Sequence, residues 1–254
     1  MTTTLDGAVA VITGASSGIG AATARRLAAE GATVVGLARR ADRLSAVAED
    51  VRGAGGTMGV VATDLTERDS TDQAVERVVA EHGRIDILVN NAGVMYVGPV
   101  ADAGEGEWEQ MIATNLHAVL NITHCVLPHL TAAVNSSQRA VADIVNVSST
   151  AGRVARPGTA VYSLTKFGLN AFSESLRQEL LPRRVRVGLV EPGVVDTDLH
   201  ANLAPGVRET IAQRGDAVKM LKPDDIADSI CYMVTRPSHV ALNEILVRPT
   251  DQTW

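Results

Sequence analysis

AVAVITGASSGIG, residues 8–20, joins a short apolar run to three glycines spaced G-x-x-x-G-x-G. The apolar run 8–13 predicts a strand that is buried on both faces. A helical pattern of apolar residues follows in 18–30. Glycines at a strand-to-helix turn let the backbone approach a pyrophosphate group at the N-terminus of the helix. This arrangement predicts a strand, a phosphate-binding loop and a helix in direct succession.

The predicted loop offers several hydrogen-bond donors to a phosphate. A glycine triplet alone also fits a plain tight turn, so its spacing is weak evidence. Its place directly after the first predicted strand favours phosphate binding. The residues expected at the phosphates are Gly14, Ser16, Ser17, Gly18, Ile19 and Gly20.

Working outward from this loop, β-branched runs alternate with longer segments rich in alanine, leucine and arginine. The predicted strands are 8–13, 33–38, 60–63, 85–90, 144–148, 186–190 and 244–247. The predicted helices are 18–30, 41–52, 71–82, 105–130, 160–181 and 223–234, and the polar stretch 131–139 is a predicted surface loop. Continuous apolar strands between helices predict an α/β fold, a doubly wound parallel sheet of about seven strands with helices on both faces.

Length and composition limit the class of protein. The chain has 254 residues, of which 46% are hydrophobic, and this apolar content excludes intrinsic disorder. No long linker or repeat divides it, so we expect a single domain over 1–254, with the irregular region 197–222 as a candidate substrate lid. The net charge of −6 argues against nucleic acid or an anionic membrane surface as the main partner.

Cysteine usage and hydropathy suggest a location. Cys125 and Cys231 are far apart and lack metal-ligand spacing, so neither a disulfide scaffold nor a metal site is expected. The first six residues are polar and lack a signal-peptide pattern. No apolar run reaches the about 18 residues needed to span a bilayer. We therefore expect a cytoplasmic protein that acts on a small molecule.

The residues after the second predicted strand indicate which nucleotide the loop would hold. An acidic residue at this point favours NAD, but here the strand ends in Arg39 and Arg40. Arg39 can pair bidentately with a 2′-phosphate, with Arg40 beside it. Two solvated arginines are the simpler interpretation, although cations are unfavourable at a helix start. The sequence therefore favours NADP(H) over NAD.

Two further strand ends supply candidate cofactor contacts. Asp64, with Leu65 beside it, follows the third strand and can either bind the adenine amino group or cap the next turn. Asn91, Ala92 and Gly93 follow the fourth strand and suit a backbone that lies against a cofactor. A simple Asn/Gly turn is the alternative interpretation of the second segment.

A tyrosine and a lysine open the long predicted helix 160–181. Tyr162 and Lys166 are four residues apart, so they share one helix face. Such a pair alone is usually a surface pair, but Ser148 and Ser149 end the fifth strand at the edge where ligands bind in such sheets. An ammonium group near a phenol lowers the pKa of the phenol, and a tyrosine so tuned can give or take a proton.

These motifs together resemble one family. T-G-x-x-x-G-I-G at 13–20, N-N-A-G at 90–93, Ser149 and Y-x-x-x-K are similar to the short-chain dehydrogenase/reductases over essentially the whole chain. The resemblance implies an NADP(H)-dependent oxidoreductase with a Rossmann fold. It implies a catalytic set of Asn115, Ser149, Tyr162 and Lys166. It also places at the nicotinamide the residues Pro192, Gly193, Val195 and Thr197, and adds Tyr162 and Lys166 to the cofactor contacts.

The resemblance implies a role for each catalytic residue. Hydride passes from the nicotinamide to a carbonyl carbon, Tyr162 protonates the oxygen, and Ser149 donates a hydrogen bond to the same oxygen. Lys166 holds the ribose and tunes Tyr162, while Asn115 supports a water that links Lys166 to solvent. An alcohol dehydrogenase that works oxidatively and a non-catalytic NADP-binding sensor stay open as alternatives. The family also implies a homodimer or homotetramer built on the two long helices.

The substrate is less well determined. The expected pocket walls include Met95, Tyr96, Arg153 and Val194, and they suit a medium-sized carbonyl compound. An anionic group near Arg153 would fit, although solvated loop charge is the commoner role for such arginines. Segments at 160–177, 191–193 and 248–252 resemble the subgroup with clavulanate-pathway aldehyde reductase and ketoreductases of aromatic polyketides such as angucyclines. This subgroup implies a carbonyl reductase of secondary metabolism.

Overall fold

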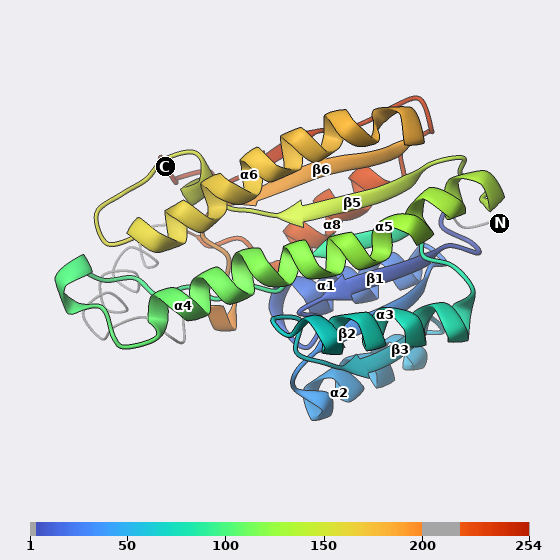
Figure 1. The fold of residues 1–254 in the computed structure, drawn as a ribbon, viewed down its shortest axis with the longest axis horizontal. Coiled ribbons are helices and arrows are strands. Elements are labelled where there is room, and N and C mark those ends of the chain that lie inside the picture. Colours follow the sequence, from blue (N-terminus) through green and yellow to red (C-terminus); the bar gives the residue numbers. More distant parts are fainter. Residues whose placement is uncertain (1–3, 200–218, 254) are drawn as a thin grey trace.

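The computed structural model describes residues 4–199 and 219–253. Within them, one parallel sheet has the strand order β3-β2-β1-β4-β5-β6-β7 (Figure 1). Strand β1 lies between β2 and β4, and its Val11 pairs with Val35 on β2 and with Leu88 on β4. The strands are β1 (Val9–Thr13), β2 (Thr33–Ala38), β3 (Thr57–Ala62), β4 (Ile87–Asn90), β5 (Ala142–Val147), β6 (Val185–Pro192) and β7 (Glu244–Val247).

Helices cover both faces of this sheet. One face carries α1 (Gly18–Ala29), α2 (Ala41–Gly53) and α8 (Pro223–Val234), which share a buried apolar core. The face toward the viewer in Figure 1 carries α3 (Arg68–His82), α5 (Ala118–Ser136) and α6 (Ala160–Leu180). The predicted α/β fold, a doubly wound parallel sheet with helices on both faces, is confirmed. No helix in residues 4–199 and 219–253 is long and apolar enough to cross a membrane.

The predicted helix 105–130 differs most from the structure. It is divided into α4 (Glu107–Ile112), a π-helical turn (Ala113–His117) and α5. The predicted loop 131–139 is wrong as far as Ser136, because α5 continues to that residue. Ala133 extends the buried face of α5, and the Thr131 hydroxyl donates to the Leu127 carbonyl 2.9 Å away, so the polar residues here remain compatible with a helix.

The candidate lid 197–222 lies mostly outside the described residues, at 200–218. Its flanking residues lie side by side. Val195 forms a parallel bridge with Leu221, and the Leu221 amide donates to the Val194 carbonyl at 3.0 Å. The segment therefore leaves and rejoins the sheet at one place, next to the end of β6.

The sheet has a topological switch point beside β1. β2 lies on one side of β1 and β4 on the other, so chain connections diverge from this strand. In open α/β sheets, ligands bind outside the carboxyl ends of the strands at such a point. The glycine loop after β1 and the asparagine segment after β4 therefore meet where a ligand is expected.

Candidate active site

A cavity of about 1550 Å³ opens at this edge of the sheet. It exceeds the about 300–1,000 Å³ that is typical of a site for one small ligand, so an extended ligand and a second molecule can share it. The predicted cofactor residues on its wall are Gly14, Ser16, Ser17, Gly18, Ile19, Arg39, Arg40, Asp64, Leu65, Asn91, Ala92, Gly93, Pro192, Gly193, Val195 and Thr197. Ser149, Tyr162, Lys166, Met95 and Val194 also line it.

The glycine loop fits a pyrophosphate. Gly14 has a φ of +66°, and a Cβ there would lie 2.9 Å from the Ala92 Cα, so a side chain is excluded where the loop meets the segment after β4. α1 begins after Ser17 with no side-chain cap and no acidic residue in its first turn, which leaves amide donors for an anion. Gly20 does not line the cavity. A Cβ there would lie 2.4 Å from the Gly14 carbonyl oxygen, so it serves close packing instead.

Thr13 holds the ends of β1 and β4 together. Its hydroxyl oxygen accepts from the amides of Asn91, at 2.9 Å, and Ala92, at 3.0 Å. The Asn91 side chain returns a bond from Nδ2 to the Thr13 carbonyl at 3.0 Å. This role was not predicted from the sequence, although the threonine directly before the first glycine was a visible sign of it.

Three arginines lie at the end of the cavity beside β2. Arg40 donates to the hydroxyls of Ser16, at 3.2 Å, and Ser17, at 2.9 Å. Arg39 lines the same region. Arg43, which the sequence analysis missed, also lines it and pairs with Asp198 at 2.9 Å. Its position three residues after Arg40 in the first turn of α2 was the available sign.

Asp64 caps the turn after β3 and also lines the cavity, and its contact with adenine stays a prediction. Its Oδ1 accepts from the Thr66 amide at 3.0 Å and from the Thr66 hydroxyl at 2.8 Å, which caps the turn after β3. Burial opposes ionisation, but these bonds and the nearby charge of Arg39 hold the pKa of Asp64 below its ordinary value. The side chain also lines the cavity as a carboxylate.

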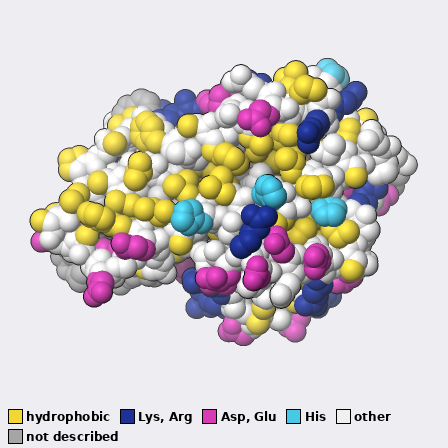
Figure 2. All heavy atoms as spheres, viewed as in Figure 1, with side chains coloured by type: hydrophobic (Ala, Val, Ile, Leu, Met, Phe, Trp, Pro, Cys, Tyr) yellow, Lys and Arg dark blue, Asp and Glu magenta, His cyan; other side chains and the backbone are white. Residues whose placement is uncertain are grey.

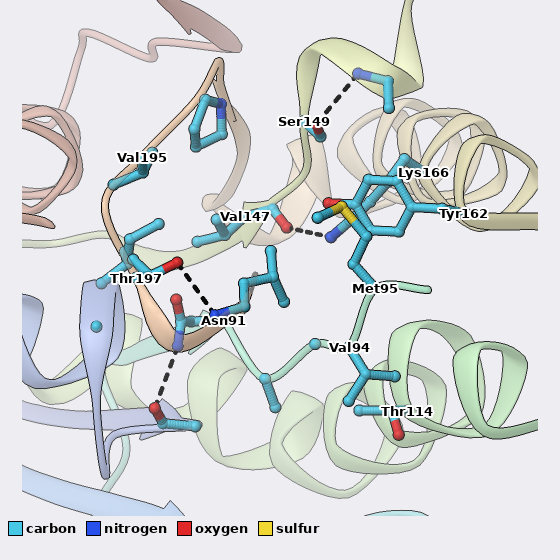
Figure 3. A pocket seen from close by; sticks show the side chains of 18 of the residues that line it. Asn91, Val94, Met95, Thr114, Val147, Ser149, Tyr162, Lys166, Val195 and Thr197 are labelled. Atoms are coloured by element: carbon cyan, nitrogen blue, oxygen red, sulfur yellow. Dashed lines mark hydrogen bonds between the residues drawn. The ribbon is translucent and has the colours of Figure 1, made fainter. Parts of the chain in front are cut away.

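Tyr162 and Lys166 project from the first turns of α6 into the cavity (Figure 3). The Lys166 ammonium lies 5.7 Å from the Tyr162 ring centroid and donates to the Val147 carbonyl at 2.9 Å. Burial raises the pKa of Tyr162 to about 12, opposed by a hydrogen bond with Ser149. Burial also lowers the pKa of Lys166 to about 8. The expectation that Lys166 lowers the pKa of Tyr162 is wrong here, because burial outweighs it, and Tyr162 is a protonated donor at neutral pH.

The Ser149 hydroxyl is oriented by its own loop. Its Oγ accepts from the Ala151 amide at 3.1 Å, which caps a 3₁₀ turn (Thr150–Gly152) after β5 (Figure 3). Because the oxygen accepts from the backbone, the hydroxyl hydrogen is left to donate. Ser149 and Tyr162 thus provide two donors in one region of the cavity.

Asn115 is buried in the π-helical turn and does not line the cavity. Its Oδ1 accepts from the Val94 amide and its Nδ2 donates to the Val94 carbonyl, both at 2.9 Å. The same Nδ2 donates to the Thr165 hydroxyl at 3.1 Å. The side chain therefore ties the segment after β4 to α6, one residue before Lys166.

Residues 8–208 match the family model described as short chain dehydrogenase. The chain belongs to the short-chain dehydrogenase/reductase family. It is 36% identical to serine 3-dehydrogenase of Agrobacterium fabrum, over 96% of this chain and 94% of that protein. It is 40% identical over 250 residues to glycine betaine reductase ATRR of Emericella nidulans, but spans only 19% of that protein's length.

Solved structures of other family members contain both types of nicotinamide cofactor. The closed form of serine dehydrogenase with NADP⁺ has a TM-score of 0.88 and 30% identity, covering 97% of this chain and 96% of that one. A 3-ketoacyl-(acyl-carrier-protein) reductase of Brucella melitensis with NADH has a TM-score of 0.81 and 32% identity, covering 96% and 98%. This short-chain dehydrogenase/reductase is an NAD(P)-dependent oxidoreductase that acts on CH–OH groups.

Two predicted substrate residues of this dehydrogenase/reductase lie elsewhere. Tyr96 lines a separate cavity of about 350 Å³, and its hydroxyl donates to Gln110 Oε1 at 2.5 Å. The Arg153 guanidinium pairs with Glu191 and Glu244 and does not line the active-site cavity. The prediction that these two wall the substrate cavity is corrected, because their polar groups have partners outside it.

The C-terminal turn supplies cavity residues that the sequence analysis missed. Asp251, Gln252 and Thr253 line the cavity. Gln252 Oε1 accepts from the Val194 amide at 2.9 Å and so holds the loop after β6. No local motif marks this contact, because its partners are 58 residues apart. Among residues 4–199 and 219–253, no cluster of three or more His, Cys, Asp or Glu side chains could hold a metal ion.

Proposed function

We propose that this protein is an NADPH-dependent carbonyl reductase in which Tyr162 is the general acid. The observation that carries the proposal is the buried, protonated Tyr162 beside Ser149 and Lys166 in one cavity, with the pKa of Tyr162 raised to about 12. A phenol that holds its proton at neutral pH suits a reaction that consumes a proton. Reduction of a ketone or aldehyde is such a reaction.

The side chains of the cavity have separable roles in this proposal. A nicotinamide dinucleotide bound along the glycine loop supplies the hydride. Ser149 donates a hydrogen bond to the carbonyl oxygen and orients it, and Tyr162 Oη then donates its proton to that oxygen. The Lys166 ammonium stabilises the phenolate that remains. Asn115 maintains this geometry through Val94 and Thr165.

We expect a preference for NADPH over NADH from the three arginines at the β2 end of the cavity. Arg39 follows β2 and has no acidic neighbour on that strand end. Replacing Arg39 by Asp removes one cation and adds an anion at the place of a 2′-phosphate. Since a charge-assisted contact is worth about 1.5–3 kcal/mol, we expect at least about a tenfold loss in kcat/KM for NADPH relative to NADH.

Initial rates with each nucleotide measure this preference. The matched control is Arg68→Asp, because Arg68 is an exposed arginine at a helix start, away from the cavity. An unchanged nucleotide preference in Arg39→Asp would remove Arg39 from the proposed phosphate site.

The substrate half of the cavity suits a medium-sized carbonyl compound. Met95 and Val194 give it apolar walls, and Arg156 and Asp251 add one charge of each sign. The resemblance to clavulanate-pathway and polyketide reductases was inferred from sequence segments alone, and on that basis ketones and aldehydes of secondary metabolism are the first compounds to test. Relatives named for serine and glycine betaine add zwitterionic and cationic compounds to the set.

A spectrophotometric screen of NADPH oxidation against these ketones and aldehydes tests the reaction. Turnover with NADPH supports the reductase. Turnover only of NADP⁺ with the corresponding alcohols at neutral pH would identify an oxidative dehydrogenase instead. Tight nucleotide binding without turnover in either direction would identify a non-catalytic NADP-binding protein.

We also propose that the protein forms a homodimer or homotetramer through the outer face of α5 and α6. Leu120, Leu164 and Phe167 are 44–59% exposed there. Figure 2 shows hydrophobic side chains gathered over this side of the molecule. Contiguous exposed apolar surface of this kind marks interaction sites.

A charge placed in this face is expected to break the assembly. Phe167→Glu should shift the protein to a smaller species in sedimentation or light scattering, because an unpaired charge is costly to bury. Ser45→Glu adds the same charge at an exposed position of α2, on the opposite face of the sheet, and should leave the assembly unchanged. Equal assembly of wild type and Phe167→Glu would rule out this interface.

A further inference from the structure

A buried carboxylate lies behind the segment that carries the catalytic serine. Glu191, near the end of β6, is 0% exposed. Its Oε2 accepts from Arg153 Nε at 2.8 Å and from Arg153 Nη2 at 2.5 Å, while its Oε1 accepts from Asn170 Nδ2 at 2.8 Å. A fully buried carboxylate is costly unless it is paired in this way, so its place here needs an explanation.

Asn170 connects this carboxylate to the catalytic serine segment. It lies on α6 one turn after Lys166, on the same helix face. Its Oδ1 accepts from the Ser148 hydroxyl at 2.5 Å, and its Nδ2 also donates to the Gly152 carbonyl at 3.2 Å. A single amide on the catalytic helix therefore holds both ends of the segment 148–152, which contains Ser149.

The space inside this network is fully used. A Cβ on Gly152 would lie 2.9 Å from Ser148 Oγ and 3.0 Å from Asn170 Nδ2. A shift of the segment toward α6 would press Gly152 against these atoms, and a shift away would lengthen its bonds to Asn170. Its position relative to the helix that carries Tyr162 is therefore set by side chains, since no strand pairing joins the segment to α6.

Arg153 anchors the far end of the same segment. Its guanidinium neutralises Glu191 on β6 and also pairs with Glu244 on β7. The segment is thereby attached to two strands as well as to α6. None of Arg153, Asn170 and Glu191 lines the active-site cavity, so any effect on the reaction must pass through the segment 148–152 or through α6.

We propose that Arg153, Asn170 and Glu191 are positioning residues that set the place of the Ser149 hydroxyl relative to Tyr162. This inference rests on the proposed carbonyl reductase function, because it concerns the two donors to one substrate oxygen. A misplacement of about 1 Å at a reacting centre can cost about 10²-fold in rate. The network joins the segment 148–152, which carries Ser149, to α6, which carries Tyr162. The relative position of these two elements decides the distance between the two hydroxyl groups.

Two substitutions test the proposal. Ser148→Ala removes one oxygen atom, whereas Asn170→Ala removes a whole amide group and with it the bonds to Glu191 and Gly152. Asn170→Ala and Ser148→Ala each remove one partner of the Ser148–Asn170 bond. The matched control is Gln178→Ala, because Gln178 is also an α6 amide that donates to a carboxylate, Glu174, at 2.8 Å, but on the exposed face. We expect kcat to fall at least about tenfold in Asn170→Ala, with the NADPH dissociation constant changed less than about threefold.

A variant with both substitutions shows whether Ser148 and Asn170 affect kcat through the bond between them or independently. The effects of substituting two residues that act through one shared contact do not add. Ser148→Ala/Asn170→Ala should therefore be no slower than Asn170→Ala alone. Additive losses in kcat would overturn the proposal, and so would a loss of NADPH binding that parallels a loss of thermal stability, because both point to general disruption.

Hydrogen exchange gives a readout that does not depend on turnover. The peptide 148–153 contains the Ala151 and Gly152 amides, which bond to Ser149. Exchange in it should become at least about tenfold faster in Asn170→Ala or Ser148→Ala and stay unchanged in Gln178→Ala. Unchanged exchange overturns the network even if no carbonyl is ever reduced, whereas faster exchange with unchanged kcat overturns its role in positioning. If the wild-type protein reduces no carbonyl compound that is tested, the proposed function is wrong, and the role of the network in positioning Ser149 for that reaction is wrong with it.

Discussion

Tyr162→Phe is expected to lower kcat for carbonyl reduction by about 10³-fold, within the range found for loss of a general acid. The phenylalanine ring fills the same buried volume, so the fold and the nucleotide site should be retained. The lost group is the one hydroxyl that is both hydrogen-bonded to Ser149 and held in its protonated form by burial. Steady-state rates and nucleotide binding by fluorescence measure the two properties separately.

Tyr96→Phe is the matched control for this experiment. It removes the same hydroxyl from a tyrosine whose hydroxyl donates to Gln110 in the neighbouring cavity. We expect its kcat to remain within about threefold of wild type, as for loss of one hydrogen bond outside the site. A Tyr162→Phe enzyme that keeps the wild-type rate would show that another group supplies the proton.

The elements that the sequence predicted best are those whose patterns are local. The apolar run 33–38, the helix 223–234 opened by proline, and the last strand 244–247 agree with β2, α8 and β7 at both ends. In β2 and α8, burial and the local propensity point to the same structure, whereas β7 is only partly buried and its apolar run alone marks it. The end of α5 could not be predicted from polarity, because Ala133 is buried although polar residues surround it in the sequence.

The cofactor half of the site was predictable for a similar reason. Its residues follow the ends of β1, β2, β4 and β6, and parallel pairing brings those ends to one edge. Gly14 and Asn91 could therefore be placed together from separate motifs. Gly20 belongs to the same motif, but it packs against the Gly14 carbonyl instead of lining the cavity. Its position within the first turn of α1 decides this, and the motif alone does not show it.

The substrate half was harder, because its contacts join distant parts of the chain. Arg153 looked like a free loop cation, yet its partners Glu191 and Glu244 lie 38 and 91 residues away. Gln252 reaches the loop after β6 only because the C-terminal turn returns to this edge. Neither pairing leaves a local pattern, so composition and spacing could not reveal them.

Lys166→Met is expected to have the second largest effect. The substitution removes the ammonium that stabilises a Tyr162 phenolate but keeps an unbranched apolar side chain of similar length. We expect kcat for reduction to fall by about 10²-fold, at the lower end of effects on acid–base catalysis. Methionine cannot replace the charge, whereas Lys166→Arg keeps it and should retain more activity, although its planar head is larger.

The pH dependence distinguishes this role of Lys166 from a structural one. Burial lowers the pKa of Lys166 to about 8, so wild-type reduction should slow as pH rises through this value and the ammonium is lost. In Lys166→Met this decrease in rate with rising pH should disappear. Stability gives a second check: the unfolded chain keeps this proton up to the ordinary value of 10.5, so wild type gains stability between about pH 8 and 10.5. Lys166→Met should lose this gain in thermal melts, and a variant that keeps both pH effects would show that another group titrates here.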